Sequence, residues 1–414
     1  MKTTIIGGGI IGLCSAYYLS EAGIDVEIID KTDLSDGCSF GNAGMIVPSH
    51  FVPLATPGVI AKGLKWMFNS KSPFYIKPRL SPELLQWLWK FYQSCSKEKV
   101  DRAIPLMRDF QLLSKGLYQD LAKKSELDFL YKEDGILMLF NSKKAEKEEI
   151  ETAELANKIG IEAKVLNSEA VNKIEPGTTV KALGGVYYPG DAHVYPNRLM
   201  NGMITLLKKR GVVFRDKTEV IGFDYQNNKI ESILTSKNEK IPLENLIIAG
   251  GSWTAKILKF LGIKMLLQDG KGYSVTLKNT EDNLTIPSIL AEAKVAMTPM
   301  GKGLRIGGTL EISNLSSKIN YNRLEGILES VPKYYPNLEP KVSSSDSIWH
   351  GFRPCTPDGL PYMGRSKKYK NLVIATGHAM MGMSLGPASG KLVSEIVQQS
   401  SISLDLTLLE PNRF

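Results

Sequence analysis

Apolar and polar positions change along the chain between short strand-like runs and longer stretches of helical spacing. A strand-like run at residues 3–6 leads into a glycine turn, a largely apolar segment indicates a helix around residues 13–22, and a second strand-like run lies at residues 26–29. Short apolar runs that end in glycine are typical of buried strands, whereas longer periodic segments are typical of helices. The first thirty residues therefore predict a strand, a turn, a helix and a second strand.

Two further apolar runs, at residues 246–249 and 372–375, also end in glycines and predict buried parallel strands. Because such strands occur at the start, in the middle and towards the end of the sequence, we expect one discontinuous cofactor domain. The predicted fold class is α/β, a Rossmann-like cofactor-binding domain with a second, α+β substrate domain. We expect the cofactor domain to comprise residues 1–50, 145–262 and 346–414, and the substrate domain to comprise residues 51–144 and 263–345.

The remaining periodic segments predict further helices and strands in both domains. They predict helices at residues 102–124, 143–158, 196–209 and 388–398, and strands at residues 185–188, 212–214, 219–223 and 229–235.

Length and composition limit the class of protein. At 414 residues the chain exceeds the size at which one hydrophobic core keeps growing, which favours two domains. It has 43% hydrophobic and 23% charged residues, as ordinary globular proteins do, and no apolar run of about 20 residues that could span a bilayer. The first residues lack the regions of a signal peptide, so we expect cytoplasmic residence.

The net charge and the cysteines limit the class of protein only a little further. The net charge of +8 fits a nucleic-acid partner, an anionic membrane surface or solubility alone, and does not choose among them. Four cysteines without CxxC spacing or nearby histidines argue against a disulfide framework and a metal site, and favour buried free thiols.

A glycine-rich turn carries the first chemical signal. Gly7, Gly9 and Gly12 follow a predicted strand and open a predicted helix, and Asp30 ends the next strand. Gly7 permits the tight turn, Gly9 lets a pyrophosphate approach the backbone, and Gly12 lets the helix pack on the strand. The helix N-terminus offers unpaired amides to the phosphates, and Asp30 can accept hydrogen bonds from ribose hydroxyls. This context predicts a dinucleotide site that includes Gly7, Gly9, Ile10, Ile11, Gly12, Asp30 and Lys31.

Two other glycine-rich segments favour FAD over NAD. Residues 37–45 carry small side chains whose backbone amides can follow a cofactor beyond its adenosine half. Residues 377–384 lead into a predicted helix, whose first amides suit the anionic pyrimidine edge of a reduced flavin. Two such segments suit a long cofactor that stays bound.

Several motifs are spread along nearly the whole chain. They are GGGIIG, SFGNAGMIVPSH, PGV with KGLKWMF, DGKGYSVTL, GLRIGGTLEI, HGFRPCTPDGLPYMGR and GHAMMGMSLG. Together they resemble the D-amino-acid dehydrogenase small-subunit group of the D-amino-acid oxidase and glycine oxidase superfamily of flavoproteins. The resemblance implies FAD and oxidative deamination of small D-amino acids to 2-oxo acids and ammonia. It also implies that electrons pass to a respiratory acceptor, a quinone or a carrier protein, and not mainly to oxygen.

The resemblance also assigns roles to single residues. Val220 falls where the family contacts adenine through its backbone, and Arg353 falls where the related oxidases bind the substrate carboxylate. Cys355 does not match the covalent flavin cysteine of sarcosine oxidases, which favours noncovalent FAD. The other residues expected to face the cofactor are Ser39, Asn42, Ala43, Gly44, Met45, Gly250, Gly382, Met383 and Ser384.

Four side chains are candidates for the chemistry. The planar guanidinium of Arg353 can bind a carboxylate through two parallel hydrogen bonds, and hydride can then pass from the α-carbon to the flavin without a strong protein base. Tyr273 either covers the substrate or is a half-buried strand tyrosine, and the sequence leaves both open. His378 precedes the helix expected to point at the flavin, and His193 is a further candidate contact with the substrate.

Two segments depart from the family pattern. The segment PGDAHVYPNRL differs from the enterobacterial dehydrogenases, and Asp269 and Gly270 replace the proline that usually precedes KGYS. Substrate choice therefore stays open, with D-proline or D-hydroxyproline as a variant and oxygen-dependent oxidation of glycine or sarcosine as an alternative. For His50 and His350 we expect core or capping roles.

Between residues 62 and 92, aromatic side chains are interleaved with basic ones. The set comprises Trp66, Phe68, Trp87, Trp89, Lys65, Lys71, Lys77, Arg79 and Lys90. We expect a helix pair that packs its aromatic residues on the core, with peripheral contact at the inner face of the cell membrane as the open alternative. A flavin-binding module attracted to RNA is a third hypothesis. No aromatic and basic nucleic-acid motif supports it, so we expect no nucleic-acid partner.

Overall fold

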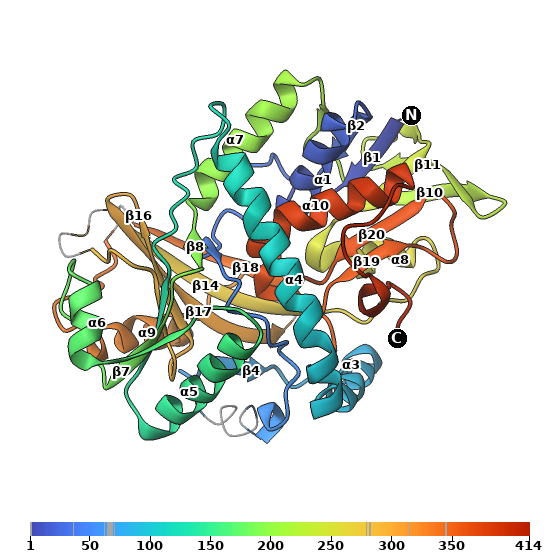
Figure 1. Ribbon diagram of the computed structural model, residues 1–414. Helices are drawn as coiled ribbons and strands as arrows, with labels where there is room; N and C mark the ends of the chain where they lie inside the picture. Colours follow the sequence, from blue (N-terminus) through green and yellow to red (C-terminus); the bar gives the residue numbers. More distant parts are fainter. Residues whose placement is uncertain are drawn as a thin grey trace.

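The computed structural model describes residues 2–35, 37–61, 63, 69, 71–278, 280, 283–313, 315–343 and 346–414. Two large sheets and the helices that cover them make up the molecule (Figure 1). The predictions for Lys65, Trp66 and Phe68 concern positions outside the described residues.

One sheet contains the predicted strand, turn, helix and strand. Among the described residues its six strands lie in the order β19 (Tyr362–Arg365), β20 (Leu372–Thr376), β13 (Asn245–Ile248), β1 (Lys2–Ile6), β2 (Asp25–Ile29) and β9 (Val213–Arg215). The pairs from β20 to β9 are parallel, and β19 runs antiparallel to β20. The sheet therefore joins segments from the start, middle and end of the sequence, as the apolar runs predicted.

The second sheet is mixed. In the part of the chain that the structure describes, its main path is β18 (Ser347–Cys355), β14 (Gln268–Leu277), β17 (Gly303–Ser313), β16 (Val295–Met300), β15 (Ser288–Leu290), β5 (Ile136–Phe140), β7 (Gly184–Tyr188) and β6 (Lys164–Asn167), with β4 (Phe74–Ile76) beside β17. Smaller sheets are formed by β10 (Val220–Gln226), β11 (Lys229–Thr235) and β12 (Lys240–Pro242), and by β3 (Met45–Ile46) with β8 (Ala192–His193).

Sheet membership differs from the expected domain boundaries at two places. Strands β6 and β7 fall within the expected cofactor segment 145–262, and β18 falls within 346–414, yet all three belong to the mixed sheet. The reason is pairing: β7 adds to β5 and β18 adds to β14, and neither strand shows the glycine-terminated apolar pattern on which the boundaries were based. The two sheets therefore divide the chain at these strands differently from the expected boundaries, and the division into domains stays a prediction.

The helices described are α1 (Ile10–Glu21), α3 (Pro82–Ser94), α4 (Lys97–Ala122), α5 (Lys143–Lys158), α6 (Ser168–Ile174), α7 (Pro196–Lys209), α8 (Thr254–Lys259), α9 (Tyr321–Ser330) and α10 (Gly382–Gln398), with short 3-10 turns at Gly251–Trp253, Val331–Lys333, Ala379–Met381 and Thr407–Leu409. Helices α4, α5 and α7 overlap the predicted ranges 102–124, 143–158 and 196–209, whereas α6, α8 and α9 were not predicted. No described helix combines the length and apolarity that a bilayer span requires.

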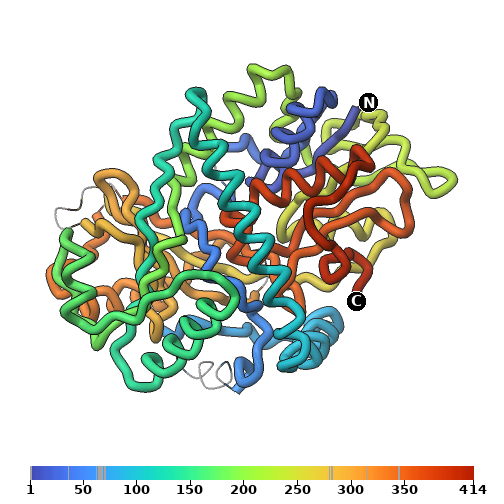
Figure 2. The backbone as a smooth tube through the Cα atoms, viewed as in Figure 1, coloured from blue at the N-terminus to red at the C-terminus, as the bar shows by residue number. Residues whose placement is uncertain are grey.

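Helix α1 is buried between its sheet and α10, so the N-terminal and C-terminal segments lie side by side (Figure 2). Two glycines of α10 permit this close approach. A Cβ added to Gly386 would come 2.7 Å from Cγ1 of Ile10, and one added to Gly390 would come 2.3 Å from the carbonyl carbon of Cys14. Cys14 and Cys355 are buried and Cys38 and Cys95 are partly buried, all four as free thiols.

Candidate active site

A cavity of about 1000 Å³ is lined by residues of both large sheets. It extends from the ends of β1 and β2, along residues 37–45, to β14, β17 and β18. This volume is at the upper end of the range for small-molecule and cofactor sites. All the residues expected to face the cofactor line it, apart from Gly12 and Gly44.

The glycine turn at one end of the cavity has no room for side chains. Gly7 has φ +111°, and a Cβ there would lie 2.5 Å from the oxygen of Ala249. A Cβ on Gly12 would lie 1.9 Å from the oxygen of Gly7, which is the close packing of helix on strand that the sequence predicted. The wall is therefore bare backbone at the first turn of α1, and such a wall suits a pyrophosphate.

Asp30 and Ser39 shape this turn. Oδ2 of Asp30 accepts a hydrogen bond from the amide of Gly8 at 2.7 Å, and its Oδ1 accepts one from the amide of Thr32 at 2.8 Å. The hydroxyl of Ser39 accepts from the amide of Ile10 at 3.1 Å. The carboxylate thus holds the two strand ends together while it faces the cavity, where a ribose would lie.

Lys31 and Val220 line the cavity at the end where the adenosine of the cofactor is expected. The ammonium of Lys31 lies 3.8 Å from the ring centroid of Trp253. Burial against this ring lowers the pKa of Lys31, although Glu219 and Asp30 oppose the shift.

Arg305, which the sequence did not single out, fixes the loop at residues 37–45. Its buried guanidinium donates from Nη1 to the carbonyl oxygens of Phe40 and Asn42 at 2.9 and 2.7 Å, and from Nη2 to Asn197 at 3.0 Å. Nε donates to the hydroxyl of Thr276 at 2.9 Å. Burial lowers the pKa of Arg305 to about 10. A cation in the buried strand β17 was the available signal, because such a residue needs many acceptors.

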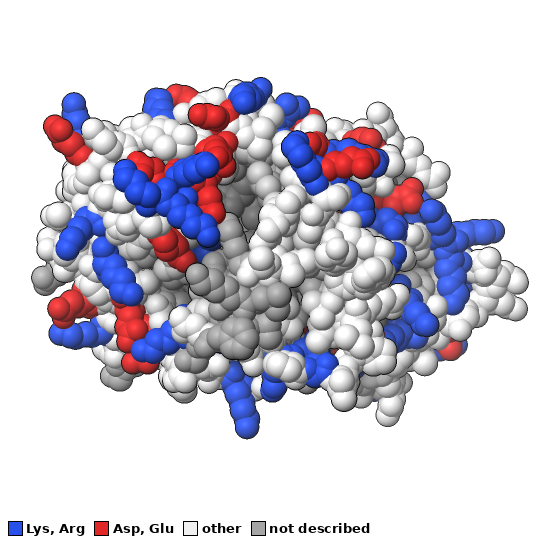
Figure 3. Space-filling model, turned by 90° about the horizontal axis from the view of Figure 1, so that it is seen from below, with Lys and Arg blue, Asp and Glu red and all other residues white. Residues whose placement is uncertain are grey.

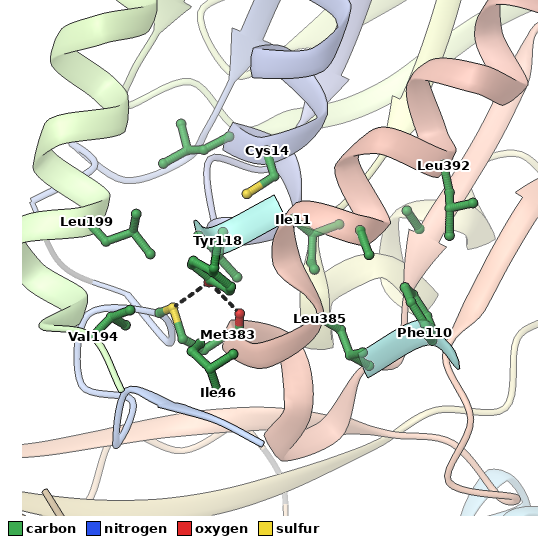
Figure 4. Packing of buried hydrophobic residues seen from close by; sticks show 14 of the residues in the cluster. Ile11, Cys14, Ile46, Phe110, Tyr118, Val194, Leu199, Met383, Leu385 and Leu392 are labelled. Atoms are coloured by element: carbon green, nitrogen blue, oxygen red, sulfur yellow. Dashed lines mark hydrogen bonds between the residues drawn. The ribbon is translucent and has the colours of Figure 1, made fainter. Parts of the chain in front are cut away.

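The first turn of α10 closes the cavity on another side and begins at Gly382, before the expected residue 388. Pro387 cannot donate to the carbonyl of Met383, and the hydroxyl of Tyr118 on α4 does so instead, at 2.6 Å (Figure 4). Ser384 accepts from the amide of Val47 at 2.9 Å. Helix α4 therefore supplies the hydrogen bond that Pro387 cannot make within α10.

Arg353 lies in the cavity wall on β18. Nη1 donates to the carbonyl oxygen of Thr309, a residue with φ +64°. Burial lowers the pKa of the Arg353 guanidinium, and no carboxylate of a described residue forms an ion pair with it. The site therefore contains a desolvated cation that a ligand carboxylate would stabilise.

Tyr273 is a buried residue of β14 whose hydroxyl is bonded within the protein. Its hydroxyl donates to Glu311 at 3.3 Å, whereas the next residue of β14, Ser274, donates to the carbonyl of Gly41 in the cofactor loop at 3.0 Å. Successive strand residues point to opposite faces, so the Tyr273 side chain points away from the loop. Burial and Glu311 raise its pKa to about 12. Tyr273 nevertheless lines the cavity, so its expected role at the substrate stays a prediction.

The two candidate histidines have different surroundings. His378 lines the cavity, and its Nε2 lies 2.8 Å from the hydroxyl of Ser389, with its pKa lowered to about 3 by burial. His193 does not line the cavity; its backbone pairs with Met45 and Lys132, and burial lowers its pKa to about 4. Its placement outside the cavity lining therefore does not support the expected contact with the substrate. His50, expected in a core or capping role, lines the cavity.

Comparison with known proteins identifies a matching family and similar sequences. Residues 2–396 match the family model described as "DAO: FAD dependent oxidoreductase". The chain is similar to a D-amino acid dehydrogenase of Helicobacter pylori, with 33% identity over 402 residues, covering 97% of this chain and 95% of that protein. A D-amino acid dehydrogenase of Granulibacter bethesdensis is 29% identical over 416 residues, covering 98% and 97% of the two proteins.

Solved structures share the fold at lower identity. A glycine oxidase from Geobacillus kaustophilus matches with a TM-score of 0.80 and 20% identity, covering 100% of this chain and 98% of that one. An L-proline dehydrogenase from P. horikoshii matches with a TM-score of 0.78 and 21% identity, covering 100% and 97%.

Proposed function

Because the chain belongs to the family of FAD-dependent oxidoreductases, we propose that it oxidises the bond between the α-carbon and the nitrogen of small D-amino acids. The observation that carries this proposal is the guanidinium of Arg353, which lies in the wall of a cofactor-sized cavity without a carboxylate partner among the described residues. The relatives named D-amino acid dehydrogenase support the choice of the D configuration.

The glycine turn, the loop at residues 37–45 and the start of α10 would hold the cofactor noncovalently. When bound, FAD supplies the acceptor for the hydride of the α-carbon. Arg353 binds the substrate carboxylate and so fixes the α-carbon, while the apolar wall formed by Leu54, Phe74 and Leu310 excludes water. The imino acid then hydrolyses to a 2-oxo acid and ammonia, or leaves as a cyclic imine.

Charge within the cavity favours uncharged substrate side chains. Among the described residues that line the cavity, the acids are Asp30 and Glu219, and both lie at the adenosine end. A cationic side chain would therefore find no acidic partner near Arg353 among these lining residues. D-proline and D-hydroxyproline satisfy this condition, as other D-amino acids with uncharged side chains do, and their oxidation is kept as a variant. Oxidation of glycine or sarcosine with oxygen is the alternative that the test below must separate.

We further propose that α3 contacts the inner face of the cell membrane, where a quinone or a carrier protein accepts the electrons. Trp87 on α3 is 2% exposed and donates to the carbonyl of Cys355 at 2.9 Å, as core packing requires. On the other side, Leu85 and Trp89 are 61% and 58% exposed, and Trp89 stacks on the exposed Tyr92. Figure 3 views the molecule from below, the side on which α3 lies in Figure 1, and shows Lys and Arg towards the right, beside an area of uncharged residues. Exposed aromatics beside basic residues are typical of interfacial helices.

The test of the main activity is anaerobic bleaching of the flavin by a panel of D- and L-amino acids that includes D-proline and cis-4-hydroxy-D-proline. We expect bleaching by D-amino acids with uncharged side chains, and reduction of an artificial dye in air with little hydrogen peroxide. Bleaching by L-amino acids only, or by no amino acid, would contradict the substrate class. Peroxide formed at the full turnover rate would instead support an oxidase.

Membrane contact is tested separately by sedimentation with anionic phospholipid vesicles. Replacing Trp89 and Tyr92 by Ser should reduce binding while leaving dye-linked activity in solution unchanged. Equal vesicle binding by the variant and the unchanged protein would remove α3 from the interface.

A further inference from the structure

A chain of hydrogen bonds joins a buried carboxylate to the wall of the cavity. Asp191, which is 0% exposed, accepts from the amide of Ser49 at 3.0 Å and from its hydroxyl at 2.5 Å. Oγ of Ser49 lies 3.0 Å from Nδ1 of His50, and His50 lines the same cavity as Arg353. Asp191 lies between β7 and β8, whereas Ser49 and His50 follow β3, so two distant segments build this chain.

We propose that His50, Ser49 and Asp191 form a proton relay that removes the proton from the substrate ammonium before hydride leaves the α-carbon. This inference rests on the proposed oxidation of amino acids. An N–H bond of the ammonium breaks as a proton binds Nε2 of His50. The Nδ1–H proton of His50 passes to Oγ of Ser49, and the original hydroxyl proton passes to the carboxylate of Asp191. The imidazole ends neutral, and the proton rests on Asp191.

The direction of each hydrogen bond follows from the single proton of the Ser49 hydroxyl. When Asp191 is ionised it can only accept, so Ser49 donates to it and accepts from Nδ1–H of His50. A neutral imidazole then carries no proton on Nε2. Among the described residues no hydrogen bond engages Nε2, so this nitrogen is available to a ligand in the cavity. When Asp191 is protonated every bond reverses, and Nε2 carries a proton.

The surroundings make Asp191 the resting place of the proton. Burial raises the pKa of Asp191 to about 7, although its bonds to Ser49 and the charge of Lys115 on α4 oppose the shift. Burial and the charge of Lys294, between β15 and β16, lower the pKa of His50 to about 4. Tyr188, at the end of β7, is the other titratable group that interacts with Asp191, and its pKa is raised well above neutrality. Imidazole therefore transmits the proton and does not store it.

The relay is compatible with the rest of the site. Arg353 supplies the charge that binds the substrate carboxylate, and a nearby imidazolium would add a second cation against the ammonium. A neutral imidazole with an unprotonated Nε2 avoids this repulsion and offers an acceptor to the ammonium. Among the described residues His378 has no comparable chain, because its Nε2 is bonded to Ser389.

The test measures the rate of flavin reduction in the flavin-loaded protein, without oxygen and with a saturating D-amino acid, from about pH 6 to about pH 10. We expect the rate to fall as pH decreases through about 7, where Asp191 gains a proton. In Ser49→Ala and His50→Gln the rate at neutral pH should fall about 100-fold. It should recover towards that of the unchanged protein at the highest pH, where the free amine of the substrate forms without help. His193→Gln, a buried histidine outside the cavity, is the matched control and should keep the original profile.

Nitrogen-15 NMR of histidine-labelled protein checks the relay without turnover, with His50→Gln providing the assignment. Nε2 of His50 should be unprotonated above about pH 7 and protonated below it, and this change should disappear in Ser49→Ala. Protonation of Nε2 throughout the range would overturn the relay, as would a uniform loss of rate at all pH values or an unchanged rate in both variants. If no D-amino acid reduces the flavin, the proposed function fails, and the NMR result still decides the relay.

Discussion

The guanidinium of Arg353 lies against the backbone of Gly272, so that a Cβ added to Gly272 would come 2.2 Å from Nη1 and 2.3 Å from Cζ. Gly272 belongs to β14, Arg353 to β18, and Thr309, which accepts from Arg353, to β17. Three neighbouring strands therefore fix the position of one cation. The glycine in KGYS is required by this contact, since any side chain there would displace the guanidinium.

Gly272→Ala should accordingly impair substrate binding while the flavin stays bound. Loss of well-placed hydrogen bonds to a charged group costs about 1.5–3 kcal/mol, which corresponds to a fall in kcat/KM of roughly 10-fold to 100-fold. The measurement is steady-state kinetics together with the flavin spectrum. Gly116→Ala on α4 is the control, because a Cβ there meets nothing within 4 Å. Unchanged kinetics in Gly272→Ala would show that the position of this cation does not govern binding.

Replacing Arg353 itself should distinguish the contribution of its charge to substrate binding from the contribution of its planar geometry. Arg353→Met removes the charge and should raise KM by about 100-fold or more, because the substrate carboxylate loses its partner. Arg353→Lys keeps the charge but lacks the planar fork, so it should recover only part of the loss. Flavin content, measured by absorbance, should match that of the unchanged protein in both variants. Equal KM values for the Met and Lys variants would contradict a role in binding a carboxylate.

Arg305→Met should loosen the cofactor loop. The side chain donates to four groups, two of them carbonyl oxygens of that loop, and Met leaves these buried acceptors without a donor. We expect the free energy of unfolding to fall by about 3 kcal/mol and the flavin to dissociate faster. Arg198→Met, which removes an exposed ion pair with Asp128, is the matched control and should change stability by less than about 1 kcal/mol. A loss no greater than in this control would exclude Arg305 as the support of the loop.

Gly390→Ala should push α10 away from α1 and so destabilise the fold. The added methyl group would lie 2.3 Å from the carbonyl carbon of Cys14, a backbone atom that cannot move independently. Overpacking of this kind costs about 1–3 kcal/mol and should lower Tm. Because α10 also carries Met383 and Ser384 in the cavity wall, flavin affinity should fall in parallel. An unaltered Tm would show that α1 and α10 have room for the added methyl group, contrary to the close contact in the structure.

Stability should depend on pH through Asp191. Burial raises its pKa from 3.8 to about 7, so the folded protein binds this proton more tightly than the unfolded chain does. The contribution of Asp191 to stability is therefore fully present below about pH 4 and is lost as pH rises through about 7. Asp191→Asn, which does not titrate, should gain stability relative to the unchanged protein over this interval, by up to about 4 kcal/mol. Urea unfolding at both ends of the interval measures the gain, and a constant difference between the two proteins would contradict the raised pKa.

The pattern of apolar runs was sufficient to predict the parallel sheet. An apolar run that ends in glycine indicates a buried parallel strand by itself, so the pairing of β1 with β2 and β13 could be anticipated. The sheet membership of β7 and β18 could not, because it depends on partners distant in sequence and not on local periodicity. The start of α10 was missed for a similar reason, since the donor that replaces the amide of Pro387 is Tyr118 on another helix.

In the candidate site, too, some features follow from the local sequence and others depend on residues distant in the chain. Backbone-lined positions such as Gly7 and Gly12 follow from sequence, because only glycine fits the space. The direction of Tyr273 depends on which face of β14 meets the cofactor loop, and that is a tertiary fact. Likewise, the segment PGDAHVYPNRL stood out in the sequence through His193, but it is Asp191 that connects with the cavity, through residues far away in the chain.

The parallel sheet joins segments that a ribosome produces at very different times. Ile6 pairs with Ile248, and Ile248 pairs in turn with Ile374. While the nascent chain is still short, the edge of β1 that will receive β13 has no partner, and such edges are prone to misassociation. Since α10 also supplies part of the cavity wall, flavin loading is a late step of biosynthesis, which follows translation of nearly all of the chain.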